Sequence, residues 1–168
     1  WWGTDNGLPE DFVALWRFTI DYLRNNQKLR NLLVVYSTAD YYSDWEMMGR
    51  YPGDDYVDVM GFDRYQLDTT NTYRSNMKRQ IELMQQLADE HHKLTSIAET
   101  GYQGIPDSTW WSKQLLPILS AYNKLSYVLI WRNNGPEHYY TPYPGQTSAQ
   151  DFNRFYKSSS VMFNDRLT

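Results

Sequence analysis

The chain has 168 residues, a net charge of −4 and no cysteine. This length suffices for one domain with a hydrophobic core, but a closed (β/α)₈ barrel takes roughly 200 to 250 residues. The acidic balance argues against nucleic-acid binding, the missing cysteine excludes disulfides and thiolate metal sites, and no apolar run approaches the length of a membrane span.

Hydrophobic spacing predicts helices and strands that alternate along the chain. The first part comprises a helix over 8–26, a strand over 29–36, a short helix over 44–48 and a strand over 56–62. The second part comprises a helix over 72–92, a strand over 94–98, a helix over 109–121, a strand over 126–131 and a helix over 148–163. The continuous apolar run in 29–36 indicates a strand covered on both faces. This α/β alternation predicts a parallel sheet with right-handed crossovers, either a small doubly wound sheet or half of a barrel.

Polar and aromatic residues stand at the ends of three predicted strands. Asp63 and Tyr65 follow the second strand, and Glu99 follows the third. Trp131 and Arg132 end the fourth. The carboxyl ends of parallel strands carry the functional groups of such folds, so we expect these side chains to gather at one site. No glycine-rich phosphate-binding motif follows the first strand, which disfavours a nucleotide-binding domain.

Aromatic residues make up 17% of the chain, with 15 Tyr and 7 Trp. Flat rings in a cleft present apolar faces to the C–H faces of sugars, and their polar tips supply hydrogen bonds. A tyrosine-rich surface without a binding role is the alternative. We expect Trp110 and Trp111 to pack against the fold rather than to form a surface platform.

The residues alone leave the role of each carboxylate open. Glu99 is either a catalytic nucleophile, with Tyr65 as its hydrogen-bond donor, or a strand-end carboxylate that caps the next loop. Asp63 stands two residues before Tyr65, so both point to the same side of an extended segment. It either binds a sugar hydroxyl or caps a loop. For Asp58 we expect a structural pairing with a cation at the start of its strand.

Several blocks of sequence follow one another in a characteristic order. They are Trp1–Gly3, Pro52–Tyr65, Ala98–Gly101, Trp131–Asn133 and His138–Gly145. Together they resemble the carboxyl-terminal part of glycoside hydrolase family 26, which consists mostly of endo-β-1,4-mannanases. The resemblance covers essentially the whole chain. It implies that residues 1–168 form about the second half, strands 5 to 8 with their helices, of one (β/α)₈ catalytic domain that needs no cofactor or metal.

The resemblance also assigns roles to single residues. It implies retaining hydrolysis by two glutamates, with Glu99 as nucleophile, Tyr65 beside it, and the acid/base glutamate outside this chain. Trp131 and Arg132 match positions that serve the glycone subsites. The full set of side chains from which we expect substrate contacts is Trp131, Arg132, Asp63, His138, Trp1, Trp2 and Tyr102.

The expected function is endo-acting hydrolysis of β-1,4-mannosidic bonds in mannan, glucomannan or galactomannan. The alternatives are the same framework acting on β-glucan or xylan, and a half barrel that binds β-glycan without cutting it. The expected partners are β-mannan or manno-oligosaccharide and the amino-terminal half of the same catalytic domain. The chain starts at Trp1 without a signal peptide, so we expect it to be processed or truncated. The substrate implies a secreted, periplasmic or cell-surface protein.

Overall fold

The computed structural model describes residues 7–69 and 72–167. Trp1 and Trp2, from which we expected substrate contacts, lie outside these residues. No helix of the described part is long and apolar enough to cross a lipid bilayer.

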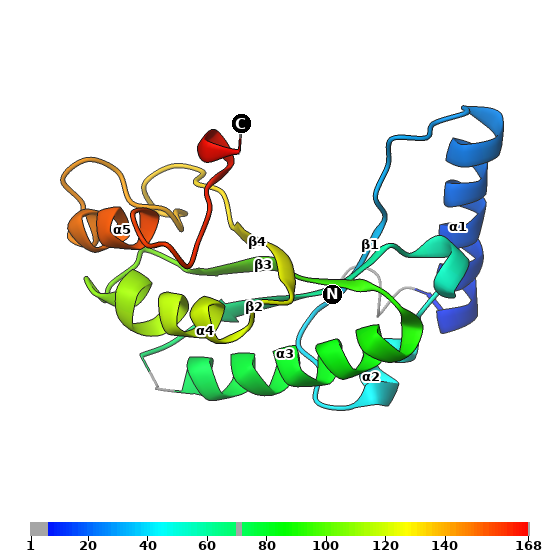
Figure 1. Ribbon diagram of the computed structural model, residues 1–168, viewed down its shortest axis with the longest axis horizontal. Helices are drawn as coiled ribbons and strands as arrows, with labels where there is room; N and C mark the ends of the chain where they lie inside the picture. The colour runs from blue at the N-terminus through cyan, green and yellow to red at the C-terminus, as the bar shows by residue number, and fades with distance from the viewer. Residues whose placement is uncertain (1–6, 70–71, 168) are drawn as a thin grey trace.

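Within the described residues, four parallel strands form one sheet in the order β1-β2-β3-β4 (Figure 1). The strands are β1 (Val35–Thr38), β2 (Val59–Gln66), β3 (Leu94–Tyr102) and β4 (Leu125–Ile130). The helices are α1 (Pro9–Asp21), α2 (Asp44–Met48), α3 (Thr72–His91), α4 (Leu116–Ala121) and α5 (Ala149–Tyr156). A π-helical turn over Tyr22–Asn26 follows α1, and another over Trp111–Leu115 precedes α4. Short 3₁₀ turns lie at Asp54–Tyr56 and Asn164–Arg166.

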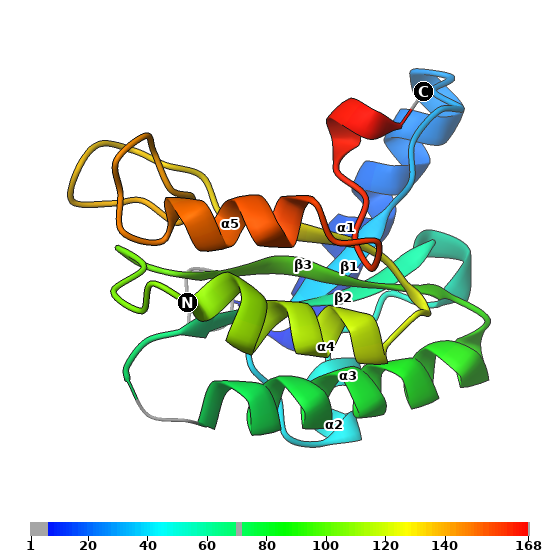
Figure 2. The same cartoon turned by 60° about the vertical axis from the view of Figure 1, so that its left-hand side comes forward.

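The hydrophobic core lies between the sheet and the helices α3 and α4, which run side by side along one face of the sheet (Figure 2). It is formed by fully buried side chains of these elements, among them Met60, Phe62, Met77, Ile81, Met84 and Ile97. Trp110 and Trp111 are also fully buried, which confirms that they pack inside the fold. Their ring N–H groups donate to Gln66 Oε1 at 2.8 Å and to Ser148 Oγ at 3.1 Å, so neither indole is buried without a partner.

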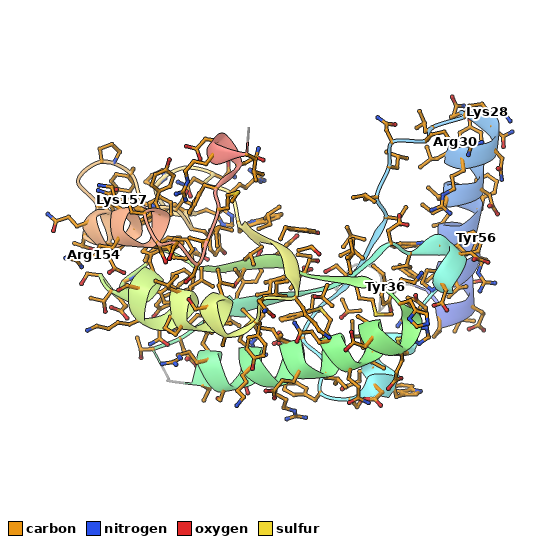
Figure 3. All side chains as sticks on the ribbon, viewed as in Figure 1. Lys28, Arg30, Tyr36, Tyr56, Arg154 and Lys157 are labelled. Carbon is orange, nitrogen blue, oxygen red and sulfur yellow. The ribbon has the colours of Figure 1, made fainter. Side chains whose placement is uncertain are left out.

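Helix α1 begins at Pro9, with acidic residues in its first turn, and only one of its faces packs against the fold. On that face Trp16 donates to the backbone oxygen of Tyr56 at 3.1 Å, and its ring meets Tyr36 edge-on (Figure 3 labels both tyrosines). On another face Leu8, Leu15, Phe18 and Tyr22 are exposed. Phe18 is 67% exposed, so an apolar stripe of α1 remains uncovered in this chain.

Several element boundaries differ from the sequence prediction; β2, for example, spans Val59–Gln66 rather than 56–62. The first strand begins at Val35 rather than at 29, and Leu33 is 73% exposed, so the expected coverage of 29–36 on both faces is wrong for its first part. The regular ladder with β2 starts only at the Val35–Val59 pair, and before it the Val34 oxygen accepts from the N–H groups of Asp58 and Val59 at 2.9 and 3.1 Å. The third strand continues beyond Ala98 to Tyr102, and the last helix ends at Tyr156.

Asp58 has the structural role that we expected. Its Oδ2 accepts from the Val34 N–H at 2.7 Å and lies 3.9 Å from the guanidinium of Arg24. The carboxylate therefore ties the chain before β1 to the start of β2.

The second face of the sheet carries no helix of the described residues. Ser37, Gly61 and Ser96 lie on this open face as register partners. On β4, Tyr127 is paired with Ser96, and both Tyr127 and Leu129 are exposed, Leu129 by 42%.

Candidate active site

An irregularity in strand β3 determines where Glu99 points. Phe62 pairs with Ile97, but the next residue of β2, Asp63, pairs with Glu99, so β3 contains one extra residue at Ala98. Phe62 and Ile97 face the helices and are fully buried. Strict alternation would turn Glu99 to the same side as Ile97. The β-bulge instead places Glu99 on the open face beside Asp63, as bulges often do next to active sites.

Tyr65 and Glu99 are joined directly. The Tyr65 hydroxyl donates to Glu99 Oε2 at 2.7 Å, as expected from the sequence. The pKa of Tyr65 is raised, first by burial and then by the hydrogen bond to Glu99 and its charge. Tyr65 therefore keeps its proton at neutral pH and remains a donor to the carboxylate.

Asp63 lies on the same face as Tyr65, as the spacing predicted. Its Oδ1 accepts from Ser37 Oγ at 2.9 Å. Burial raises the pKa of Asp63 to about 6, and the negative charges of Glu99 and Asp40 add to this effect. The carboxyl of Asp63 therefore changes its charge in a mildly acidic range, beside the carboxylate of Glu99.

Asp40 and Arg64 form an ion pair behind the site, which no sequence motif indicated. Arg64 Nη1 lies 2.6 Å from Asp40 Oδ2, and the arginine side chain is largely buried. The pair ties the loop after β1 to β2, next to Asp63 and Tyr65. The available signal was the position of Arg64 between Asp63 and Tyr65. A small hollow of about 110 Å³ lies here, at the carboxyl end of β2.

The chain after β4 lies over the same end of the sheet. The Trp131 N–H donates to the Thr100 oxygen at 2.9 Å, which holds Trp131 beside β3. The guanidinium carbon of Arg132 is 6.0 Å from the centroid of the Trp131 ring. Both residues stand at the carboxyl end of the fourth strand, which ends at Ile130 rather than at the predicted 131.

His138 is connected to the site through ring contacts with Tyr140. Its ring centroid is 5.2 Å from that of Tyr140, and the Tyr140 centroid is 5.4 Å from that of Tyr65. Tyr102, in contrast, is only 5% exposed and packs against Trp110 in the helix-covered core. The structure therefore does not bring Tyr102 to the open face, because its position in β3 turns it toward the helices.

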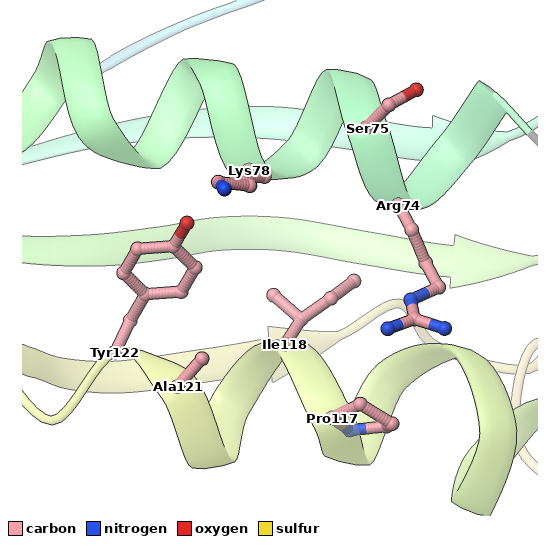
Figure 4. Close-up of a pocket in the computed structure, with 7 residues that line it drawn as sticks. All are labelled: Arg74, Ser75, Lys78, Pro117, Ile118, Ala121 and Tyr122. Atoms are coloured by element: carbon pink, nitrogen blue, oxygen red, sulfur yellow. The ribbon is translucent and has the colours of Figure 1, made fainter.

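A wider groove lies elsewhere. It has a volume of about 400 Å³ and runs between α3 and α4, with Arg74 and Lys78 on one side and Ile118 and Tyr122 on the other (Figure 4). Because α3 and α4 cover the opposite face of the sheet from Glu99, this groove is no extension of the candidate site. Among the described residues, no cluster of three or more His, Asp or Glu side chains is arranged to hold a metal ion.

The geometry supplies one of the two carboxyl groups that a known hydrolytic reaction requires. A carboxylate at the end of a parallel strand, with a fixed phenolic donor, is suited to attack an electrophilic carbon. Retaining glycoside hydrolysis needs such a nucleophile together with a second carboxyl about 5 to 5.5 Å away as acid and base.

Comparisons with known proteins agree with this arrangement. Residues 1–145 match Glycosyl hydrolase family 26. A mannan endo-1,4-beta-mannosidase of Bifidobacterium adolescentis is 24% identical over 95% of this chain and 18% of its own length. A solved GH26 beta-mannanase from Bacteroides ovatus is 40% identical and covers 100% of this chain, at a TM-score of 0.92. GH26C from Muricauda sp. MAR_2010_75 is 31% identical, also over 100% of this chain, at a TM-score of 0.87.

The chain spans 49% and 47% of the lengths of these two solved relatives, and a smaller share of the curated one. Its parallel sheet with helices on one face corresponds to part of their (β/α)₈ barrel, so the predicted fold class is confirmed. From the match over residues 1–145 and the shared fold, we conclude that this chain belongs to glycosyl hydrolase family 26.

Proposed function

We propose that the complete protein containing this chain is a retaining endo-β-1,4-mannanase and that Glu99 is its nucleophile. The observation that carries the proposal is the hydrogen bond from Tyr65 to Glu99 at 2.7 Å on the open face of the sheet. The bulge in β3 supports the proposal, because a residue that merely capped a loop would not require a bulge to turn its side chain to the open face. The names of the similar proteins support mannan as the substrate.

In the proposed reaction, Glu99 attacks the anomeric carbon of the bound mannoside and the glycosidic oxygen leaves with a proton from the acid/base residue. Water then cleaves the glycosyl-enzyme ester, while the same acid/base residue accepts a proton from that water. Tyr65 holds the Glu99 carboxylate in place before the attack. The acid/base glutamate comes from the rest of the barrel.

Substrate binding is proposed for the side chains that surround this face. Asp63 accepts a hydrogen bond from a sugar hydroxyl when it is ionised. Trp131 offers an apolar ring to a sugar face, and Arg132 and His138 supply donors. Because polymeric mannan does not cross membranes, we place the protein outside the cytoplasm.

The amino-terminal half of the same barrel is the proposed partner of the uncovered surfaces. The exposed stripe of α1 and the exposed Leu129 on the open face of the sheet are the apolar surfaces that a barrel buries. The relatives support this arrangement, because this chain spans about half of their length.

The first test is β-mannan hydrolysis by the complete protein, with Glu99→Gln beside it and Glu90→Gln, an exposed change on α3, as control. Activity that Glu99→Gln reduces by about 10⁴-fold or more, and that Glu90→Gln preserves, supports the proposal. Cleavage of β-glucan or xylan but not mannan by the wild type would mean that the same reaction acts on a different substrate. Mannan binding without turnover would favour the non-catalytic alternative.

A further inference from the structure

We propose that Tyr140 is a positioning residue that holds the Tyr65 hydroxyl on Glu99. The inference rests on the proposed role of Glu99 and adds a residue to it. Tyr140 belongs to the segment after β4, some 40 residues from Glu99 along the chain, and is 8% exposed. Its ring therefore packs inside the site region rather than against solvent.

The contact between the two tyrosines is a direct ring contact. Their centroids are 5.4 Å apart, and the ring planes are tilted by 59°. Aromatic rings at this distance attract each other beyond the effect of the area that they bury. The Tyr65 ring is thus restrained on one side by Tyr140, while its hydroxyl is fixed by Glu99. A rotation of Tyr65 away from Glu99 would break both contacts.

Glycine at position 101 makes room for the Tyr140 ring. A Cβ atom at Gly101 would lie 2.5 Å from Cδ1 of Tyr140 and 3.2 Å from its Cβ and Cγ. Such a distance is too short for a real contact, so any larger residue would displace the ring. Gly101 stands two residues after Glu99, so the strand that carries the nucleophile also carries the space for Tyr140.

Asn133 fixes the backbone that presents Tyr140. Its Oδ1 accepts from the N–H groups of Tyr140 and Thr141, each at 2.9 Å, and its Nδ2 donates to the Thr141 oxygen at 2.9 Å. These bonds make a closed link between the residue after Arg132 and the residue that contacts Tyr65. The segment is therefore fixed both at Asn133, next to Arg132, and at Tyr140, which contacts Tyr65.

Two further bonds join this segment to the chain after β3. The Gly104 N–H donates to the Tyr139 oxygen at 2.8 Å, and Gln103 Nε2 donates to the Glu137 oxygen at 2.9 Å. Both bonds hold the backbone that leads into Tyr140. Among the described residues, the Tyr140 hydroxyl donates one long hydrogen bond, to Gln103 Oε1 at 3.4 Å. The ring, rather than the hydroxyl, carries the effect on Tyr65.

The test is a double-mutant cycle in the complete protein on β-mannan. Tyr140→Ala is expected to lower kcat about tenfold, with KM changed by less than about twofold, because the loss acts on the nucleophile rather than on sugar binding. Tyr140→Phe is expected to restore kcat to within about twofold. In a Tyr65→Phe background, Tyr140→Ala should cost no more than about twofold further, since its target is already gone.

Gly101→Ala provides a second, independent perturbation, because it displaces the ring without deleting it. We expect it to lower kcat like Tyr140→Ala and to add little in the Tyr140→Ala background. The control is Tyr122→Ala, which removes a half-buried tyrosine of the outer helical layer. It should lower thermal stability and leave kcat unchanged.

Additive effects of Tyr65→Phe and Tyr140→Ala would overturn the inference, as would a Tyr140→Phe variant as impaired as Tyr140→Ala. A crystal structure of the Tyr140→Ala variant gives a readout apart from activity: the bond between Tyr65 and Glu99 should be lengthened or lost, and its retention would contradict the proposal. A wild type inactive on mannan, or an active Glu99→Gln variant, would instead refute the proposed function.

Discussion

Asp63 and Glu99 are register partners on neighbouring strands, and the bulge in β3 brings both carboxyls to the same open face of the sheet. The negative charge of Glu99 disfavours ionisation of the Asp63 carboxyl. Together with burial, this charge effect raises the pKa of Asp63 to about 6. The relationship links stability to pH and places a titrating group beside the proposed nucleophile.

Asp63→Asn is expected to change the pH dependence of stability. The folded pKa of Asp63 is about 6, and that of an unfolded Asp is about 3.9. The favourable contribution of the protonated carboxyl is therefore complete below about pH 4 and is lost as pH rises toward and through 6. Because Asn never ionises, the unfolding free energy of the variant relative to wild type should increase between pH 4 and 7. Urea unfolding of the complete protein at intermediate pH values measures this, with exposed Asp55→Asn as control; a constant difference would contradict it.

Tyr65→Phe removes the donor to Glu99 and keeps the ring. A hydrogen bond to a charged group is worth about 1.5–3 kcal/mol, so we expect kcat/KM on mannan to fall by about 10- to 100-fold. The packing against Tyr140 persists in the variant, so its stability should fall by no more than the contribution of the lost hydrogen bond. Steady-state kinetics beside a melting curve separates the two effects. Wild-type kinetics would show that the Tyr65 hydroxyl is dispensable.

Gly61 and Ser96 are packed against each other on the open face. A Cβ atom at Gly61 would lie 2.7 Å from Ser96 Oγ, and among the described residues this buried oxygen has no hydrogen-bond partner. Gly61→Ala should destabilise the protein by about 1–3 kcal/mol through overpacking. Ser96→Ala should be neutral or stabilising, because it removes a buried polar atom without a partner.

The double variant provides the control for this pair. Gly61→Ala should cost clearly less in the Ser96→Ala background, since the nearest clashing atom is then absent. Urea unfolding of all four proteins gives the coupling. Equal costs in both backgrounds would mean that another contact, such as that of Ala98, limits the space.

Phe18→Glu tests the proposed partner of α1. Phe18 is 67% exposed in this chain, and a surface position tolerates a charge within about 0.5 kcal/mol. If the rest of the barrel covers the stripe, Phe18→Glu should destabilise the complete protein by about 3 kcal/mol or more, because it buries an unpaired charge. Gln86→Glu, on an exposed position of α3, serves as control. Equal melting temperatures for both variants would show that the stripe faces solvent.

The features that the sequence determined by itself depend on close neighbours along the chain. The alternation of periods 3.6 and 2 predicted the parallel sheet with its helices, and the two-residue spacing placed Asp63 and Tyr65 on one side. The paired indoles of Trp110 and Trp111 were correctly assigned to the core. These outcomes follow from local geometry, which no distant contact overrode.

Tertiary structure decided the rest. The extra residue in β3 turned Glu99 to the open face, and no local pattern distinguishes such a bulge from a regular strand. Strand β1 starts at Val35 because a ladder begins only where its partner strand does. Tyr140 reaches Tyr65 across 75 positions of sequence, through space that only Gly101 leaves open. Register and contacts of this kind depend on pairs far apart in the chain, so they exist only once the sheet has formed.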